Sequence, residues 1–244
     1  MARGAPTPSV PAGSASLKGK APARGKPYHH GNLREALISR GKAQLAEVGL
    51  ADISLRRIAA AVGVSQVAPK HHFGNKEGLL AAIAADGFRD LAAFRASRLR
   101  NVDGAEESLR ALLASYVAFA GKHPALFALM FSPQFRSPGE HGDLADASGQ
   151  AYVALREAAA AFLAELPSRK KGASKASKKA IPEALSADEV ARSAWSSMHG
   201  IAMLLMDGQV APRGAGRVSR DRLAARTLDI FLAGIRSLGS RAGA

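Results

Sequence analysis

The sequence SLRRIAAAVGVSQVAPKHHFGNK, residues 54–76, decides the fold of this chain. Apolar residues recur at spacings of three and four in its first half, which predicts one face of a short helix. Ser54 is placed to cap that helix and Gly63 to end it, since glycine accepts the left-handed conformation needed there. Ser65 is a second capping candidate, in front of a predicted helix over residues 66–72. Two short helices joined by a glycine-containing turn predict a helix-turn-helix, whose second helix enters the major groove of DNA.

The second predicted helix is more polar than a helix that serves only in packing. Any two short helices joined by a glycine turn share the pattern, so the pattern alone leaves an ordinary helical hairpin open. The side chains suited to base edges and phosphates are Gln66, Lys70, His71 and His72. Lys76 falls in the first turn of the next predicted helix, where a cation opposes the helix dipole. That position makes sense if Lys76 faces a phosphate, so we favour a DNA-binding surface.

Residues 31–91 resemble the N-terminal domain of the TetR family of bacterial transcriptional regulators. The resemblance runs from GNLREALISRGKAQLAEVGLADISLRRIAAAVGVS through KHHFGNKEGLLAAI, and it is far more specific than a bare helix-turn-helix. The residues that carry it are Gly49, Ser54, Ala59, Gly63, Val64, Ser65, His72, Phe73, Lys76 and Glu77. The expected DNA contacts are Ser54, Arg56, Ser65, Gln66, Val67, Lys70, His71, His72 and Lys76.

Two residues of the second helix stand out. The family usually has an aromatic residue, most often tyrosine, at the position of Lys70, and that tyrosine normally contacts the DNA backbone. Lysine reaches the backbone as a point charge without the ring. Pro69 lacks an amide proton and biases Ala68 away from helical angles. We therefore expect this helix to begin irregularly.

The net charge of +14 is unevenly distributed along the chain. Residues 1–27 contribute +5 and residues 168–180 contribute +6, and neither segment contains an acid. Residues 28–100 carry eleven Lys and Arg against six Asp and Glu, so the remainder carries −2. The charge is thus concentrated at the predicted DNA-binding end and in two low-complexity segments. Such asymmetry is expected of a nucleic-acid binder whose other half has another role.

The composition argues against several other classes of protein. The chain has no cysteine, which excludes a disulfide framework and thiol chemistry and agrees with a cytoplasmic location. No apolar run approaches the roughly 20 residues of a membrane span, and the N-terminus lacks the apolar core of a signal peptide. The sequence has no phosphate loop, nucleophile elbow or set of metal ligands at ligand spacing. We therefore expect no catalysis, no metal and no cofactor.

The chain is predicted to be all-α, with about nine helices. Residues 1–27 are expected to be a disordered basic arm, which is either simply solvated or attracts phosphates without sequence preference. Residues 28–91 are assigned to a helix-turn-helix DNA-binding domain with its motif at 54–73, and residues 92–238 to a helical ligand-binding and dimerisation domain. The predicted helices outside the motif span 32–48, 76–100, 105–122, 125–131, 146–166, 187–207 and 220–238, with a loop or mobile lid at 132–145 and a disordered basic loop at 167–182.

The second part resembles the WHG-type C-terminal domain that follows some TetR heads, through HPALFALMF at residues 123–131 and WSSMHG at residues 195–200. The family resemblance implies a ligand pocket among the body helices, with adaptable walls of methionine and aromatic side chains. The candidate lining residues are Phe119, Phe127, Met130, Trp195, His199 and Met203, each of which is more often an ordinary core residue. The last two helices are apolar over a wider arc than one core needs, and in the family they form a homodimer.

These observations favour a homodimeric transcriptional repressor of the cytoplasm. It would bind a palindromic operator in double-stranded DNA and leave the operator when a small apolar effector binds. The alternative is a transcriptional activator or a low-specificity DNA-binding protein of the same fold. An enzyme with a DNA-binding head is less favoured, because no poised set of catalytic side chains is found.

Overall fold

The structure, a computed structural model, describes residues 30–135, 141–166, 185–208 and 220–241. Across these ranges the chain forms nine α-helices and one 3₁₀ turn, with no strand, which confirms the all-helical prediction. The basic arm predicted at 1–27 and the basic loop predicted at 167–182 lie outside the described residues.

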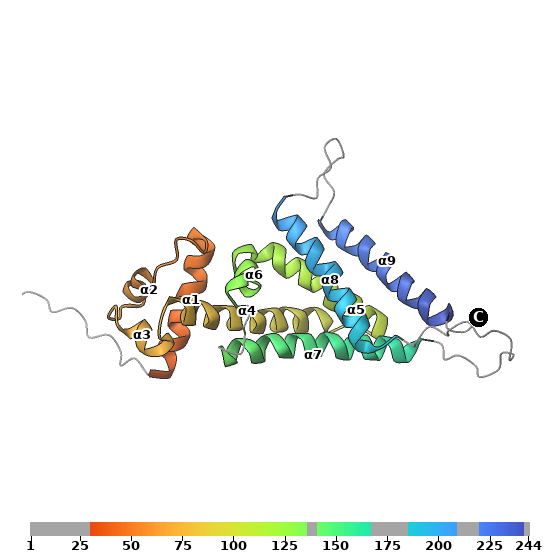
Figure 1. Cartoon of the computed structure of the whole chain (residues 1–244), viewed down its shortest axis with the longest axis horizontal. Helices are drawn as coiled ribbons and strands as arrows, with labels where there is room; N and C mark the ends of the chain where they lie inside the picture. The colour runs from red at the N-terminus through yellow and green to blue at the C-terminus, as the bar shows by residue number, and fades with distance from the viewer. Residues whose placement is uncertain (1–29, 136–140, 167–184, 209–219, 242–244) are drawn as a thin grey trace, which may run out of the picture.

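The helices follow one another in a simple order along the chain. They are α1 (His30–Val48), α2 (Leu55–Val62), α3 (Ala68–Phe73), α4 (Lys76–Leu99), α5 (Ala105–Lys122), α6 (Pro124–Met130), the 3₁₀ turn η1 (Pro133–Phe135), α7 (Gly142–Glu165), α8 (Ala187–Met206) and α9 (Arg220–Arg241). In Figure 1, α1, α2 and α3 gather at one end of the molecule, and α4 extends from them into the body. We call α1 to α3 the head and α5 to α9 the body.

One apolar core joins the head to α4. Its most deeply buried members are Leu37, Leu45, Ile58, Leu79 and Ile83, each at most 1% exposed. Burying a side chain of this size stabilises the fold by about 1.5–3 kcal/mol. Because Leu79 and Ile83 belong to α4, the start of α4 is anchored in the head. The boundary predicted at residue 91 falls inside this continuous helix.

The two ends of α2 are defined as the sequence predicts. Ser54 lies in extended backbone, and its hydroxyl oxygen accepts a hydrogen bond from the amide of Arg57 at 3.4 Å. Gly63 has a φ of 78°, in the left-handed region, and its amide bonds back to the carbonyl of Ala60. A side chain at Gly63 would meet no neighbour, so backbone conformation is the reason for glycine there.

The body is a layer of long helices around the continuation of the same apolar core. Helices α4, α5, α7 and α8 pack against one another, and α9 packs on α5 and α8. Figure 1 shows α7 running beside α4 along the long axis of the molecule, with α8 crossing α5 and α9 lying beside α8. The largest fully buried side chains of the body are Phe119, Phe127 and Phe162.

Helix α6 lies close against α4 because α4 has a glycine at the contact. A β-carbon on Gly87 would lie 2.9 Å from the sulfur of Met130 and 3.0 Å from a methyl of Leu126. Only the absence of a side chain at Gly87 leaves room for both residues of α6. This contact sets the position of Met130, which forms part of a cavity described below.

The structure corrects two predicted helix starts. The helix-turn-helix's second helix begins at Ala68 instead of residue 66, with Val67 rather than Ser65 at the N-cap position. Pro69 falls in its first turn, where a missing amide proton costs nothing because no helical partner exists. Helix α7 begins at Gly142, four residues before the predicted start at 146, because Leu144 and Ala147 are buried against the body.

No single helix in the described ranges is both long enough and apolar enough to cross a membrane. Helix α5 and the segment Pro124–Phe135 meet those criteria only when taken together, and they are bent by 112° at their junction.

Candidate nucleic-acid interface and cavity

The turn before α3 and α3 itself expose polar side chains to solvent. Gln66, Lys70 and His71 are exposed, and Val67 is 55% exposed. Pro69 is buried beneath them. Since exposed apolar side chains are unfavourable in water, Val67 is suited to an apolar contact such as a thymine methyl group. The surface therefore combines hydrogen-bonding groups with one exposed apolar side chain.

The other candidate DNA contacts occupy different settings around α3. Arg56, Ser65 and Lys76 are exposed. Ser54 is half-buried and serves the head itself, since its amide donates to the Gln44 side chain at 2.8 Å. His72 is half-buried, with its ring centroid 6.1 Å from that of Phe73. In the described chain α3 and its flanks thus bring most of the predicted residues to one surface, and their contact with DNA remains a prediction.

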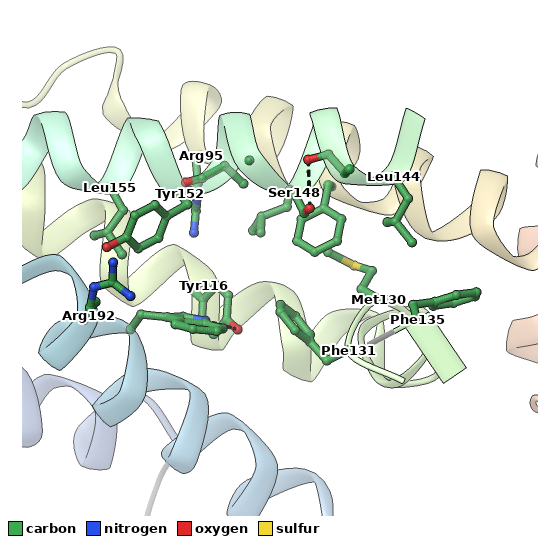
Figure 2. A pocket seen from close by; sticks show the side chains of 16 residues that line it. Arg95, Tyr116, Met130, Phe131, Phe135, Leu144, Ser148, Tyr152, Leu155 and Arg192 are labelled. Atoms are coloured by element: carbon green, nitrogen blue, oxygen red, sulfur yellow. Dashed lines mark hydrogen bonds between the residues drawn. The ribbon is translucent and has the colours of Figure 1, made fainter. Parts of the chain in front are cut away.

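A cavity of about 630 Å³, partly open to solvent, lies between α4, α5, α6, α7 and α8. Figure 2 shows its side chains: Tyr116 and Phe131 on one side, and Leu144, Ser148, Tyr152 and Leu155 of α7 on the other. Arg95 of α4 and Arg192 of α8 also line it. Its volume is in the range of small-molecule sites, and its walls are mainly apolar.

The cavity contains some of the residues predicted for it and omits others. Met130 and Trp195 line the cavity. Phe119 and Phe127 are fully buried in the core, and His199 lies behind Tyr116. Met203 is half-buried and packs against the core without lining this cavity.

The α7 wall was missed by sequence reasoning, although a signal for it exists. Leu144, Ser148, Tyr152 and Leu155 follow one another at spacings of four, four and three, which places them on one helical face. Placing the start of this helix at 146 removed Leu144 from that face. Arg95 was missed because an arginine inside a long amphipathic helix carries no signal of burial.

A hydrogen-bond chain supports the wall formed by Tyr116. The indole nitrogen of Trp195 donates to the Tyr116 hydroxyl at 3.2 Å, because an indole N–H only donates. The Tyr116 hydroxyl lies 2.8 Å from Nδ1 of His199 and can donate its one proton there. Burial lowers the pKa of His199, which favours the neutral ring that accepts this bond.

Arg95 is a buried cation at the edge of the cavity. The residue is 7% exposed, and its Nη1 donates to the carbonyl of Ala151 at a long 3.4 Å. Its guanidinium carbon lies 5.7 Å from the centroid of the Tyr116 ring. Burial lowers the pKa of Arg95 to about 10, so the group still carries its charge at neutral pH.

Asp188 satisfies the polar groups at another edge of the cavity. It accepts a hydrogen bond from the Tyr152 hydroxyl at 2.6 Å and one from Nε of Arg192 at 2.7 Å. Arg192 also lies over the Tyr152 ring, with 5.8 Å between its guanidinium carbon and the ring centroid. The three side chains therefore satisfy one another, and the negative charge of Asp188 balances the positive charge of Arg192.

Ion pairs connect the start of α7 to the head and to α4. Asp143 pairs with Arg34 of α1 at 3.3 Å and also with Arg89 of α4. The Arg34 guanidinium carbon is 5.5 Å from the ring centroid of Phe73, at the end of α3. His141 lies 3.6 Å from Glu77 in the first turn of α4. The same helix thus supplies a cavity wall and contacts the head.

The described residues contain no group of three His, Asp or Glu side chains that could hold a metal ion. The cavity's hydroxyl groups belong to Tyr116, Ser148 and Tyr152. The Tyr116 hydroxyl bonds to His199 and the Tyr152 hydroxyl bonds to Asp188, and neither partner is among the residues that line the cavity.

Two family models match the chain. Residues 37–83 match the model described as bacterial regulatory proteins, tetR family, and residues 109–231 match the model described as tetracyclin repressor-like, C-terminal domain. The second match spans half of the chain. None of the curated proteins compared with the chain matches it.

Solved structures resemble the fold over most of its length. A protein of unknown function from Rhodococcus sp. RHA1 is 28% identical, with a TM-score of 0.66 over 85% of this chain and 97% of its own. A TetR family transcriptional regulator from Thermus thermophilus is 19% identical, with a TM-score of 0.54 over 81% of this chain and 97% of its own. A ketosteroid transcriptional regulator of Mycobacterium tuberculosis is 18% identical, with a TM-score of 0.53 over 83% of this chain and 94% of its own. The last two likenesses are evidence of fold alone.

Proposed function

Because the chain belongs to the TetR family of bacterial regulatory proteins, we propose that it is a homodimeric repressor that leaves a palindromic operator when a small, largely apolar molecule enters its cavity. Family membership itself makes the chain a DNA-binding transcriptional regulator and not an enzyme. The effector, the dimer and the direction of regulation belong to the proposal, as does its place in the cytoplasm with the DNA.

The observation that carries the proposal is the double role of α7. Leu144 and Ser148 line the cavity, and Asp143, at the start of the same helix, pairs with Arg34 of the head. A molecule that displaces α7 would therefore move Asp143, the partner of Arg34. Arg34 in turn packs on Phe73 at the end of α3. Ligands change DNA affinity in this way only if they bind one arrangement better than the other.

The DNA-reading roles are assigned from chemistry and exposure. Gln66, Lys70 and His71 are proposed to govern sequence choice, since their side chains suit base edges. Lys76 is proposed to bind a phosphate. Phosphate contacts position the protein without reading sequence.

An uncovered apolar stripe on α9 supports the dimer. Ala224, Leu228 and Leu232 form the buried face of α9. A neighbouring stripe includes Ile230, 66% exposed, and Leu238, 52% exposed. Leu204 near the end of α8 adds a 47% exposed side chain. Apolar faces that remain exposed on a single chain are characteristic of subunit interfaces, and two-fold symmetry suits a palindromic operator.

A mobility-shift assay tests the proposal against its alternative, a low-specificity DNA-binding protein. Purified protein is titrated onto the DNA upstream of its own gene, in the presence and absence of unrelated competitor DNA. We expect the specific complex to survive an excess of competitor. Equal binding to both DNAs would reject the operator-specific regulator. Transcription in vitro from the same fragment distinguishes repression from activation.

A further inference from the structure

We propose that the cavity takes an amphipathic carboxylate, with the carboxylate held by Arg95 and an apolar body lying along α7. This inference rests on the proposed function for its biological meaning, because the bound molecule would be the effector. Its physical basis is independent of DNA binding, and it concerns the head group of the ligand.

Arg95 lies over the Tyr116 ring, but it has no counter-ion among the described residues and most of its hydrogen-bonding capacity is unused. A guanidinium has five N–H donors, and the one hydrogen bond from Arg95 in the described chain reaches Ala151 at 3.4 Å. The buried Nε of Arg95 has no partner there, and no described carboxylate lies within ion-pair distance. A buried cation without a counter-charge is costly, so burial of Arg95 favours binding of an anion.

The Arg95 guanidinium is directed toward the cavity. In Figure 2 it extends from α4 into the space bordered by Tyr152 and Tyr116. A carboxylate there would accept N–H donors from the outer Nη atoms of the guanidinium, since Nε is enclosed by protein atoms. Lysine lacks this planar fork, which makes the residue type informative.

The other polar groups of the cavity already have partners. Arg192 and Tyr152 both bond to Asp188, and the Ser148 hydroxyl donates to the carbonyl of Ala145 at 3.1 Å. The Tyr116 hydroxyl is used between Trp195 and His199. Arg192 has its counter-charge in Asp188, whereas Arg95 has none among the described carboxylates, so Arg95 is the group that selects the head group.

The rest of the wall suits a hydrocarbon chain or ring system. Away from Arg95, the lining includes Phe88, Leu91, Met130, Phe135, Leu144 and Leu155. Burial of apolar surface against such a wall supplies affinity without direction, and the Arg95 contact supplies orientation. A free acid with an apolar body combines both.

Competition between two ligands of equal length tests the proposal. The fluorescent neutral probe N-phenyl-1-naphthylamine is bound to the full-length protein and displaced by decanoate or by 1-decanol. We expect decanoate to compete about 10- to 100-fold better than 1-decanol, as charge-assisted hydrogen bonds require. In the Arg95→Gln variant that preference should disappear while the probe still binds. The Arg98→Gln variant should keep it, because Arg98 is an exposed arginine on the same helix that does not line this cavity.

Each outcome decides the matter. Equal competition by decanoate and 1-decanol on the wild-type protein overturns the proposal even if Arg95→Gln fails to fold, as judged by circular dichroism. Failure of decanoate to displace the bound probe, or an unchanged preference in a folded Arg95→Gln protein, also overturns it. DNA binding is measured separately by fluorescence anisotropy. A decanoate preference without specific DNA binding would reject the proposed function and retain the carboxylate site.

Discussion

Asp143 at the start of α7 forms an ion pair with Arg34 of α1, with 3.3 Å between Oδ2 and Nη2. The pair joins the head to a helix that lines the cavity. Both side chains are more than 40% exposed, so the pair contributes little to stability, about 0–1 kcal/mol. The ion pair instead helps to position the start of α7 relative to the head.

The Asp143→Asn variant should separate DNA binding from its control by ligand. We expect near-wild-type affinity for the operator without ligand, and a loss of most of the decanoate effect on that affinity, about 5-fold or more. Asp146→Asn is the matched control, because Asp146 is an exposed acid on the same helix without an ion pair in the described chain. An Asp143→Asn protein that still responds like the Asp146→Asn control would rule out the pair as a coupling element.

The Lys76→Ala variant should weaken binding to all DNA sequences alike. A phosphate contact contributes about one unit to the slope of log affinity against log salt concentration, so that slope should flatten by about one. Gln66→Ala is the comparison, and it should change base preference at one position. Anisotropy titrations over a salt series measure both effects. Altered base preference in Lys76→Ala would show that the two roles are wrongly assigned.

The Ile230→Asp variant should dissociate the dimer. Ile230 is 66% exposed on α9 in the single chain, so an aspartate there leaves the core intact but opposes burial at an apolar interface. Light scattering should show a dimer for the wild type and a dimer dissociation constant at least about tenfold weaker for the variant. Val153→Asp on α7, at a 43% exposed apolar position, should remain dimeric. Dissociation by both variants, or by neither, would place the interface elsewhere.

His199 should make stability depend on pH. Burial lowers its pKa below the ordinary value of about 6.5, so the unfolded chain binds more protons as pH falls through that value. Its contribution is therefore complete above about pH 6.5 and is lost at lower pH as the ring protonates and ceases to accept from Tyr116. Melting temperatures at about pH 7.5 and about pH 5.5 should differ less in His199→Asn than in the wild type. An equal difference in both proteins would exclude His199 as the source.

The fold was predictable where local chemistry acts alone. Ser54 and Gly63 bound α2 as their residue types require, and the apolar spacing of α4 identified its buried face. The start of α7 was harder to predict, because Leu144 lies beside polar and acidic neighbours and only its spacing from Ser148 and Tyr152 places it on the helix. Tertiary packing, which local sequence does not encode, decided that boundary.

The candidate site was predictable only in part for the same reason. The methionine and aromatic side chains of the sequence predicted a cavity wall, and two of them, Met130 and Trp195, line the cavity. Phe119 and Phe127 have the same character but face the core. Arg95 has no local signal, since its burial follows from the packing of α7 and α5 on α4.

We propose above all that this protein reads one palindromic DNA sequence as a dimer. Sequencing the genomic DNA fragments that the purified full-length chain selects tests this proposal most directly. We expect the selected fragments to share one inverted repeat. Fragments without a shared motif, recovered in proportion to their length, would contradict it.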